Sequence, residues 1–285
     1  MFNFLQAYHP QPILMKIGPF EVHWYGFLMV IGGLVGLVVI LSLVKRFDIE
    51  KGDVGALRAT PLRPLFHDLL LYFVIGAVIG ARVYYVLYAW EMYRGNWFDV
   101  LKIWQGGLAI HGIMLGGFAA TYLFCRIKKQ SFWFIADFAV VGLAAAQAVG
   151  RAGNYFNQEI FGKPTSLPWG VPIDAVNRPA AFAAAEYFHP VFLYECLGNL
   201  AIAVILFLIM RWRLKEGDRQ TGNVFLLYLV LYSAQRFLLE FLRVDYSPLI
   251  SGIRWAQAVS VALVIFALGL LLYRRRRKNV GLSAI

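Results

Sequence analysis

Seven apolar runs, each about 20 residues long, set what this chain can fold into. The hydrocarbon core of a bilayer is about 30 Å thick, and about 20 consecutive apolar residues are needed for a helix to cross it. The residues are 60% hydrophobic and only 15% charged, and the mean hydropathy of +0.63 is unlike that of a soluble domain. The sequence predicts an all-α polytopic membrane protein with seven transmembrane helices, at about 21–44, 67–90, 108–125, 132–150, 190–210, 222–242 and 253–273.

Basic residues are distributed unequally between alternate loops. Of the Lys and Arg residues, seventeen follow the first, third, fifth and seventh runs, and eight lie on the opposite side. Cytoplasmic loops carry the excess of Lys and Arg, so the N-terminus is predicted outside and the C-terminus in the cytoplasm. The net charge of +11 is therefore assigned to membrane orientation and not to nucleic acid.

The N-terminal residues, the cysteines and the histidines argue against a cleaved signal peptide, a disulfide and a metal site. No cleavable signal peptide is recognisable in the first twenty residues, so the first helix is expected to act as its own insertion signal. Cys125 and Cys196 are expected to be buried and unpaired. The five histidines have no Cys or His at ligand spacing, and neither a metal nor a cofactor is predicted.

The chain is expected to form a single integral membrane domain, residues 1–285, because no stretch has the composition of a soluble module. Two outside segments, 1–20 and 157–189, are long enough to form an arm or a lid, or merely a connector. The second has four prolines and is expected to be extended or turn-rich.

A stripe of small residues follows the fourth run, with Gly142, Ala146 and Gly150 spaced four apart. This spacing aligns them on one helix face and lets a neighbouring backbone approach closely. The stripe therefore predicts a helix-packing face.

The sixth run, "NVFLLYLVLYSAQRFLLEFLR", carries a polar stripe. At about 100° per residue, four side chains fall within an arc of roughly 80°: Tyr232, Arg236, Glu240 and Arg243. An ionisable side chain inside a membrane helix costs about 2.5–3.5 kcal/mol on insertion scales, so it needs a partner or a function. Arg236 and Glu240 either neutralise each other and hold helices together, or belong to a site.

Polar residues of other helices are predicted at the same depth. Arg82 lies about 12 Å from the outer end of its helix, at 1.5 Å per residue. Three more residues lie at outer helix ends: Tyr25, His111 and Arg151. Pairs that only hold helices together would scatter in depth, so we infer a cationic cavity open to the outer leaflet. Because guanidinium forks match phosphate oxygens, Arg151 with Asn154 nearby is predicted to hold a phospholipid phosphate.

The histidines are weaker indicators. In "WQGGLAIHG", the glycines leave room for a ligand beside His111, but a lone histidine at a helix end is often only solvated. In "HPVFLYE", His189 and Tyr194 are expected to be interfacial anchors, and Glu195 lies at the outer boundary.

The stretch from Gly150 to Gly162 reads G-R-x-G-N-x-x-N-x-E-x-x-G, thirteen residues with seven fixed positions. It resembles the signature of the bacterial prolipoprotein diacylglyceryl transferases. The resemblance includes "HWYG" at 23–26, "WQGGLAIHG", "HPVFLYE" and "YSAQRFLLEFLR", and so covers most of the chain. Two departures are "GAR" at 80–82 in place of the family's usual "GGR", and a longer cytoplasmic segment 45–66.

The resemblance implies transfer of the diacylglyceryl group of phosphatidylglycerol to the lipobox cysteine thiol of a preprolipoprotein, forming a thioether and releasing glycerol phosphate. It implies three partners, namely phosphatidylglycerol, the preprolipoprotein signal peptide and the lipid bilayer. The implied location is the bacterial plasma (inner) membrane, with the active site facing the outer leaflet.

Matching positions imply the site residues. Catalytic roles fall to Arg151, Arg236, His111, Tyr25 and Tyr232. Substrate-binding roles fall to Arg151, Asn154, Glu159, Arg82, Glu240 and Arg243. The general base stays open, because His111 either takes the thiol proton or holds the glycerol head group.

A secondary transporter of an anionic substrate is the strongest alternative, since intramembrane arginines also mark transport paths. It predicts an inverted repeat and polar residues reaching the cytoplasmic side, and neither is apparent in the sequence. A non-catalytic lipid-binding or scaffold protein is a third interpretation, which leaves the histidine and tyrosines without a chemical task.

Overall fold

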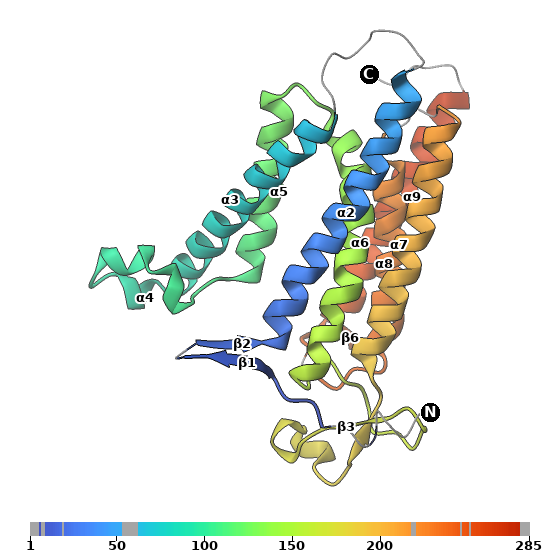
Figure 1. Cartoon of the computed structure of the whole chain (residues 1–285). Coiled ribbons are helices and arrows are strands. Elements are labelled where there is room, and N and C mark those ends of the chain that lie inside the picture. Colours follow the sequence, from blue (N-terminus) through green and yellow to red (C-terminus); the bar gives the residue numbers. More distant parts are fainter. Residues whose placement is uncertain are drawn as a thin grey trace. The chain divides into compact units, whose positions relative to one another are not determined.

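The structure is a computed structural model that describes residues 6, 9–18, 20–52, 62–217, 221–245, 247–250 and 252–279. The chain forms two compact units. The first comprises Met1–Leu43 and Asp137–Ile285, and the second comprises Val44–Ala136. Both are built mainly of long helices, as Figure 1 shows.

Each predicted apolar run is occupied by a long helix. They are α2 (Trp24–Gly52), α3 (Leu62–Tyr88), α5 (Ile110–Ile127), α6 (Phe132–Phe156), α7 (Val191–Lys215), α8 (Asn223–Glu240) and α9 (Trp255–Asn279). Among the described helices, all of these except α8 are long and apolar enough to cross a membrane. α8 has 18 residues and carries Gln235, Arg236 and Glu240 in its second half. The prediction of a mostly helical multi-pass membrane protein is confirmed, with six candidate spans.

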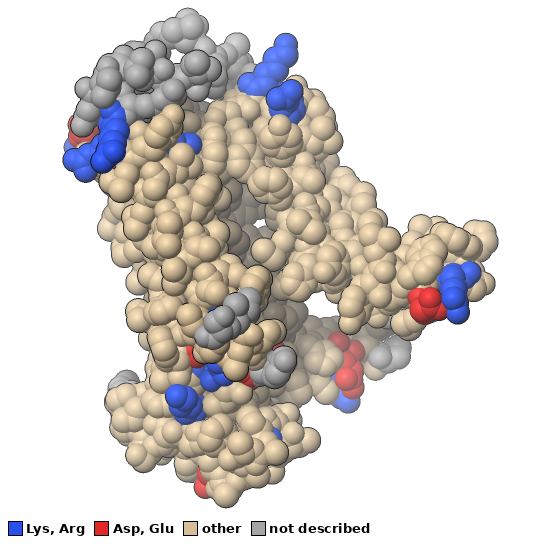
Figure 2. All heavy atoms as spheres, turned by 180° about the vertical axis from the view of Figure 1, so that it is seen from behind, with Lys and Arg blue, Asp and Glu red and all other residues tan. Residues whose placement is uncertain are grey.

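The surface over the helices fits this assignment. On the face shown in Figure 2, few Lys, Arg, Asp or Glu side chains lie over the helices. Many large apolar side chains of the helices are exposed instead of buried, for example Leu34 at 53% and Val38 at 66% on α2. In a soluble protein such a surface would aggregate, whereas lipid tails cover it without cost.

Glycines bring α2 and α6 of the first unit into backbone contact. A Cβ on Gly36 would lie 2.6 Å from the carbonyl oxygen of Gly142, and one on Gly32 would lie 2.7 Å from that of Ala146. Both gaps are too short for any side chain. The small-residue stripe is therefore a packing face, as predicted.

The second unit repeats this device between α3 and α5, which lie side by side in Figure 1. A Cβ on Gly116 would lie 2.8 Å from the Cα of Gly80, and one on Gly76 would lie 2.8 Å from the carbonyl oxygen of Gly116. The two helices are joined through three short elements, α4 (Trp90–Tyr93), η1 (Trp97–Leu101) and η2 (Ile103–Gln105).

Three two-stranded antiparallel hairpins belong to the first unit. They pair β1 (Ile13–Ile17) with β2 (Phe20–His23), β3 (Val171–Pro172) with β4 (Tyr187–Phe188), and β5 (Leu249–Ile250) with β6 (Ile253–Arg254). Of the predicted outside segment 1–20, residues 1–5, 7, 8 and 19 lie outside the described residues, as do residues 53–61 of the long segment 45–66.

Residues 157–190, here called the cap, fold into short strands and turns. The cap contains β3, β4 and the short turns η3 (Ala175–Asn177) and η4 (Ala180–Phe182). It has its own buried apolar core with the start of α7, made of Phe161, Val171, Ile173, Phe188 and Phe192. The prediction of a turn-rich segment is confirmed, and the core explains why such an irregular chain holds one conformation.

Asp137 fixes the start of α8 from a neighbouring helix. Its carboxylate is 3% exposed and accepts hydrogen bonds from the backbone N–H groups of Gly222 at 2.7 Å and Phe225 at 2.8 Å. Arg213 of α7 lies 3.4 Å away and offsets its charge. The first N–H groups of a helix have no partner within the helix, so Asp137 serves as their cap.

Candidate functional site

The signature residues form the end of α6 and the turn that follows it. The backbone N–H of Glu159 donates to the carbonyl of Asn154 at 2.9 Å. The side-chain amides of Asn157 and Asn154 donate to the Glu159 carboxylate at 3.1 and 3.5 Å. Gln158 and Ile160 have φ of 53° and 55°, a region that side chains other than glycine rarely adopt. The asparagines and the glutamate of the signature therefore hold a tight turn.

Gly162 closes the signature where no side chain fits. Its N–H donates to the carbonyl of His189 at 2.8 Å, and the N–H of Lys163 donates to that of Leu242 at 2.8 Å. A Cβ on Gly162 would lie 2.9 Å from both the His189 Cβ and the Leu242 carbonyl oxygen. The close approach brings the chain after α8 beside the signature, where Gly162 and Arg243 form an isolated β-bridge.

Glu195 on the first turns of α7 joins two arginines of other elements. Its Oε2 lies 2.8 Å from Nε of Arg151, and its Oε1 lies 3.3 Å from Nη1 of Arg243. The Glu195 side chain is 4% exposed, whereas that of Arg151 is 26% exposed. The carboxylate thus lies behind Arg151 and leaves part of the guanidinium open.

Glu240 at the end of α8 joins three arginines. Its Oε2 lies 2.5 Å from Nη1 of Arg236 and 3.8 Å from Nε of Arg243, and its Oε1 lies 3.2 Å from Nη1 of Arg254. Arg243 also donates to Asp245 at 3.0 Å. The Arg236–Glu240 pair considered from the sequence is formed, but within a larger network.

This network, here called the arginine cluster, consists of Arg151, Arg236, Arg243, Arg254, Glu195, Glu240 and Asp245. Four guanidinium groups face three carboxylates, so one positive charge is not balanced within it. The Oε2 atoms of Glu195 and Glu240 have no hydrogen bond of suitable angle within the described chain. Arg151 and Arg236 are therefore not locked into forked pairs with them, and the cluster suits an added anion.

Arg243 is the charged centre of the cluster. Burial tends to lower the pKa of its guanidinium. The hydrogen bond to Asp245 and its charge, together with the charges of Glu195 and Glu240, outweigh burial and raise that pKa above its ordinary value. Arg243 therefore stays cationic although it is only 10% exposed.

Two predicted tyrosines adjoin the cluster. Tyr25 on the first turn of α2 packs on Gly153, where a Cβ would lie 3.0 Å from the tyrosine Cδ2. Tyr232 lies one turn before Arg236 on α8, and its ring stacks on that of Tyr228 at 5.6 Å. The first unit thus gathers most of the predicted site residues: Tyr25, Arg151, Asn154, Glu159, Tyr232, Arg236, Glu240 and Arg243.

Arg82 in the second unit is occupied by backbone carbonyls. Its Nε donates to Val100 at 2.8 Å, its Nη1 to Gly106 at 2.8 Å and Gly107 at 3.0 Å, and its Nη2 to Asp99 at 2.6 Å. The side chain is 7% exposed. Four of its five N–H donors therefore hold the segment between α3 and α5, and within the described residues the fifth makes no hydrogen bond.

His111 in the second unit lies on the first turn of α5. It is exposed, and its ring stacks on that of Tyr84 at a centroid distance of 5.6 Å. Because His111 and Arg82 belong to the second unit, their part in the arginine cluster stays a prediction.

His189 and Tyr194, expected as interfacial anchors, tie the cap to α7. The Tyr194 hydroxyl accepts a hydrogen bond from Nε1 of Trp169 at 2.9 Å and lies 3.2 Å from Nδ1 of His189. Burial lowers the pKa of His189 from its ordinary value. Both residues are half-buried, and their expected role as interfacial anchors stays a prediction.

Sequence reasoning missed three members of the cluster. A carboxylate at the start of an apolar helix signals a need for a cation, so Glu195 could have been paired with an arginine. Arg254 and Asp245 lie in the short connection between α8 and α9, where no helical period predicts which residues meet.

Comparisons with known proteins identify the family of the chain. The family described as "Prolipoprotein diacylglyceryl transferase" matches residues 12–273. A phosphatidylglycerol–prolipoprotein diacylglyceryl transferase of Synechococcus elongatus is 41% identical over 92% of this chain and 86% of its own length. One of Gloeobacter violaceus is 40% identical over 94% of both chains, and one of a Synechocystis species is 38% identical over 92% of this chain and 88% of its own. The chain belongs to the prolipoprotein diacylglyceryl transferase family.

Proposed function

We propose that this chain transfers the diacylglyceryl group of phosphatidylglycerol to the lipobox cysteine of preprolipoproteins. The thiol sulfur attacks the glycerol carbon that bears the phosphate ester, a thioether forms, and the carbon–oxygen bond breaks to release glycerol phosphate. The chain is an enzyme of the kind that its relatives' names describe. The family match leaves no support for the alternative of an anion transporter.

The observation that carries the proposal is the positive excess of the arginine cluster. The departing phosphate gains negative charge as the carbon–oxygen bond breaks, and fixed cations near it lower the barrier. Arg151 and Arg236 are the arginines whose side chains stay partly exposed on α6 and α8, at 26% and 23%. We assign the phosphate to these two.

Buried carboxylates support this assignment. Glu240 and Glu195 fix the directions of Arg236 and Arg151, and Arg243 links both carboxylates. Asn154 and Glu159 have a different task, since they shape the turn after α6. Arg82 has one donor without a hydrogen bond in the described part of the chain, and we assign it a supporting role in substrate binding.

Proton removal needs a further group. A thiol with a pKa of about 8.5 is mostly protonated at neutral pH, so a base or a positive field must favour the thiolate. His111, Tyr25 and Tyr232 are the candidates. His111 takes the thiol proton or holds the glycerol head group, and the activity of His111→Gln separates the two roles.

The proposed topology has seven membrane spans, with α8 as the span that carries the site. The N-terminus lies outside, the C-terminus lies in the cytoplasm, and the arginine cluster faces the outer leaflet of the bacterial inner membrane. The excess of Lys and Arg in alternate loops supports this orientation. The whole chain then serves as one membrane domain, with the cap and the N-terminal segment covering its outer side.

Purified protein and a lipobox peptide test the proposal. We expect lipidation of the peptide and release of glycerol phosphate that both require phosphatidylglycerol. Arg151→Ala should abolish transfer with little loss of folded protein, because Arg243 still pairs with the buried carboxylate of Glu195. The matched control is Arg211→Ala, an exposed arginine on α7 outside the cluster, which should transfer normally. Normal transfer by folded Arg151→Ala would refute the phosphate assignment, and no transfer by the unaltered chain would refute the proposed function.

A further inference from the structure

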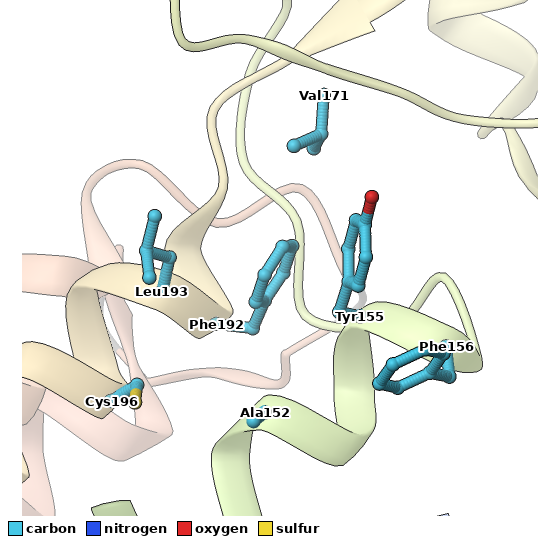
Figure 3. A pocket seen from close by; sticks show the side chains of 7 residues that line it. All are labelled: Ala152, Tyr155, Phe156, Val171, Phe192, Leu193 and Cys196. Carbon is cyan, nitrogen blue, oxygen red and sulfur yellow. The ribbon is translucent and has the colours of Figure 1, made fainter. Parts of the chain in front are cut away.

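An apolar pocket of about 180 Å³ lies in the first unit, between the end of α6 and the start of α7. Figure 3 shows the side chains that line it. α6 contributes Ala152, Tyr155 and Phe156, α7 contributes Phe192, Leu193 and Cys196, and β3 of the cap contributes Val171. The pocket is partly open and is not used by the chemistry proposed above.

The pocket adjoins the arginine cluster through both of its helical walls. Ala152 directly follows Arg151, and Cys196 directly follows Glu195. These preceding residues form the 2.8 Å ion pair between the same two helix ends. A molecule that places one of its groups in the pocket therefore also lies beside the phosphate site.

The lining decides the chemistry of the occupant. Aliphatic and aromatic carbon surrounds the space, so an apolar group gains by entering and a charged group does not. A cavity of about 150 Å³ takes a molecule of the size of benzene. The pocket therefore fits one branched or aromatic side chain, and is too small for a whole acyl chain.

The position of the pocket indicates which of the two substrates, phospholipid or peptide, occupies it. The walls are the last turn of α6 and the first turns of α7, and Val171 of the cap forms the third side. Lipid acyl chains run from the head group toward the middle of the bilayer, away from these helix ends. A signal peptide, in contrast, carries an apolar stretch just before its processing site.

We propose that this pocket binds one apolar side chain of the preprolipoprotein peptide close to the reacting cysteine, and so selects the peptide and sets its position. The inference rests on the proposed function, because it requires a peptide substrate. Ala152 and Leu193 are then specificity residues, and they do not take part in the chemistry.

A substitution cycle across the two molecules tests this inference. Apolar residues before the peptide cysteine are replaced by Gly one at a time, and kcat/KM is measured with the unaltered enzyme and with Ala152→Leu, which fills the pocket. At one peptide position, replacement by Gly should lower kcat/KM of the unaltered enzyme by about 10-fold or more, as expected when a hydrophobic group is missing. Ala152→Leu should lower kcat/KM by a similar factor with the original peptide. With the peptide that has Gly at that position, Ala152→Leu should lower kcat/KM only slightly. If the losses in kcat/KM from Ala152→Leu and from the Gly replacement are independent of each other at every peptide position, the proposal is overturned.

Two further variants keep the test decisive. Ala201→Leu makes the same change at an exposed position of α7 and should leave the peptide preference unaltered. If Ala152→Leu does not fold, Leu193→Ala enlarges the pocket and should shift the preference toward a bulkier side chain at the same peptide position. Unchanged preference in folded Leu193→Ala would also overturn the proposal. Because the unaltered enzyme is assayed alongside, failure of the pocket is distinguishable from failure of the transferase function.

Cys196 provides a direct measurement of occupancy. In a Cys125→Ser background, alkylation of Cys196 by iodoacetamide should slow when a peptide with Ser in place of its cysteine is added. The Gly peptide should protect less, and phosphatidylglycerol vesicles alone should not protect. Protection by phosphatidylglycerol and none by the peptide would assign the pocket to an acyl chain and overturn the proposal.

Discussion

Arg236→Lys separates a phosphate-binding role of Arg236 from simple neutralisation of Glu240. The lysine ammonium keeps the positive charge that pairs with Glu240, which lies 2.5 Å from Arg236. It loses the forked guanidinium that matches two phosphate oxygens. Replacing both Arg236 and Glu240 by leucine is a less clean test. Glu240 also contacts Arg254 and Arg243, which the double change would leave without that carboxylate.

The expected loss follows from one charge-assisted hydrogen bond. Such a bond contributes about 1.5–3 kcal/mol. At about 1.4 kcal/mol per tenfold in rate, the loss of one bond to the departing phosphate slows the reaction about 10- to 150-fold. The Glu240 contact survives in the lysine variant, so the thermal midpoint should fall little.

Arg254→Lys is the matched control. Arg254 contacts the same carboxylate as Arg236, and its side chain is 26% exposed against 23%. Arg254 is not assigned to the phosphate. Arg254→Lys should therefore change kcat by less than about 3-fold, as expected for a partly exposed ion pair. Release of glycerol phosphate from phosphatidylglycerol is the assay. Equal losses in the two folded variants, or no loss in either, would refute the assignment of Arg236.

Other parts of the structure give further expectations. His111→Gln should slow transfer and leave measurable turnover, as for a residue that orients the head group; a folded but fully inactive variant would make His111 the base. Gly162→Ala should lower the free energy of unfolding by about 1–3 kcal/mol through overpacking, seen as a lower thermal midpoint in detergent. Asp137→Ala should cost about 1–3 kcal/mol because the N–H groups of Gly222 and Phe225 at the start of α8 lose their acceptor, while turnover per folded molecule stays near normal. Cysteines introduced at Ser166 and Glu216 should be labelled from outside and from the cytoplasm, respectively, and the reverse pattern would overturn the orientation.

The helices were predictable because membrane thickness fixes their apolar length. The predicted ends are less accurate: α2 continues to Gly52 and α9 to Asn279, beyond the apolar runs. Charged residues are tolerated in a helix once it leaves the hydrocarbon region, so hydropathy marks the membrane boundary and not the helix end. The stripe on α8 was predictable for a similar reason, since one helical period brings Arg236 and Glu240 together.

The long-range contacts of the site were not predictable from one sequence. Glu195 and Arg243 are 48 residues apart, and no local period relates them. The role of Arg82 was hidden as well, because its four partners are backbone carbonyls, which every residue type carries. The core of the cap was missed since prolines predict irregular backbone but say nothing of which apolar side chains meet.

The base of the cap is tied by backbone hydrogen bonds, and this limits how the cap can move. Gly162 and His189 at its two ends are joined by the bonds Gly162 N–H to His189 and His189 N–H to Lys163, at 2.8 and 3.0 Å, and Lys163 is bonded in turn to Leu242. These three amides should exchange slowly with deuterium, whereas the exposed tip around Val176, at 88% exposure, should exchange fast. A cap that swung open as a whole would expose all of them together. Slow exchange of the three base amides together with fast exchange at the tip would confine any opening of the cap to its tip.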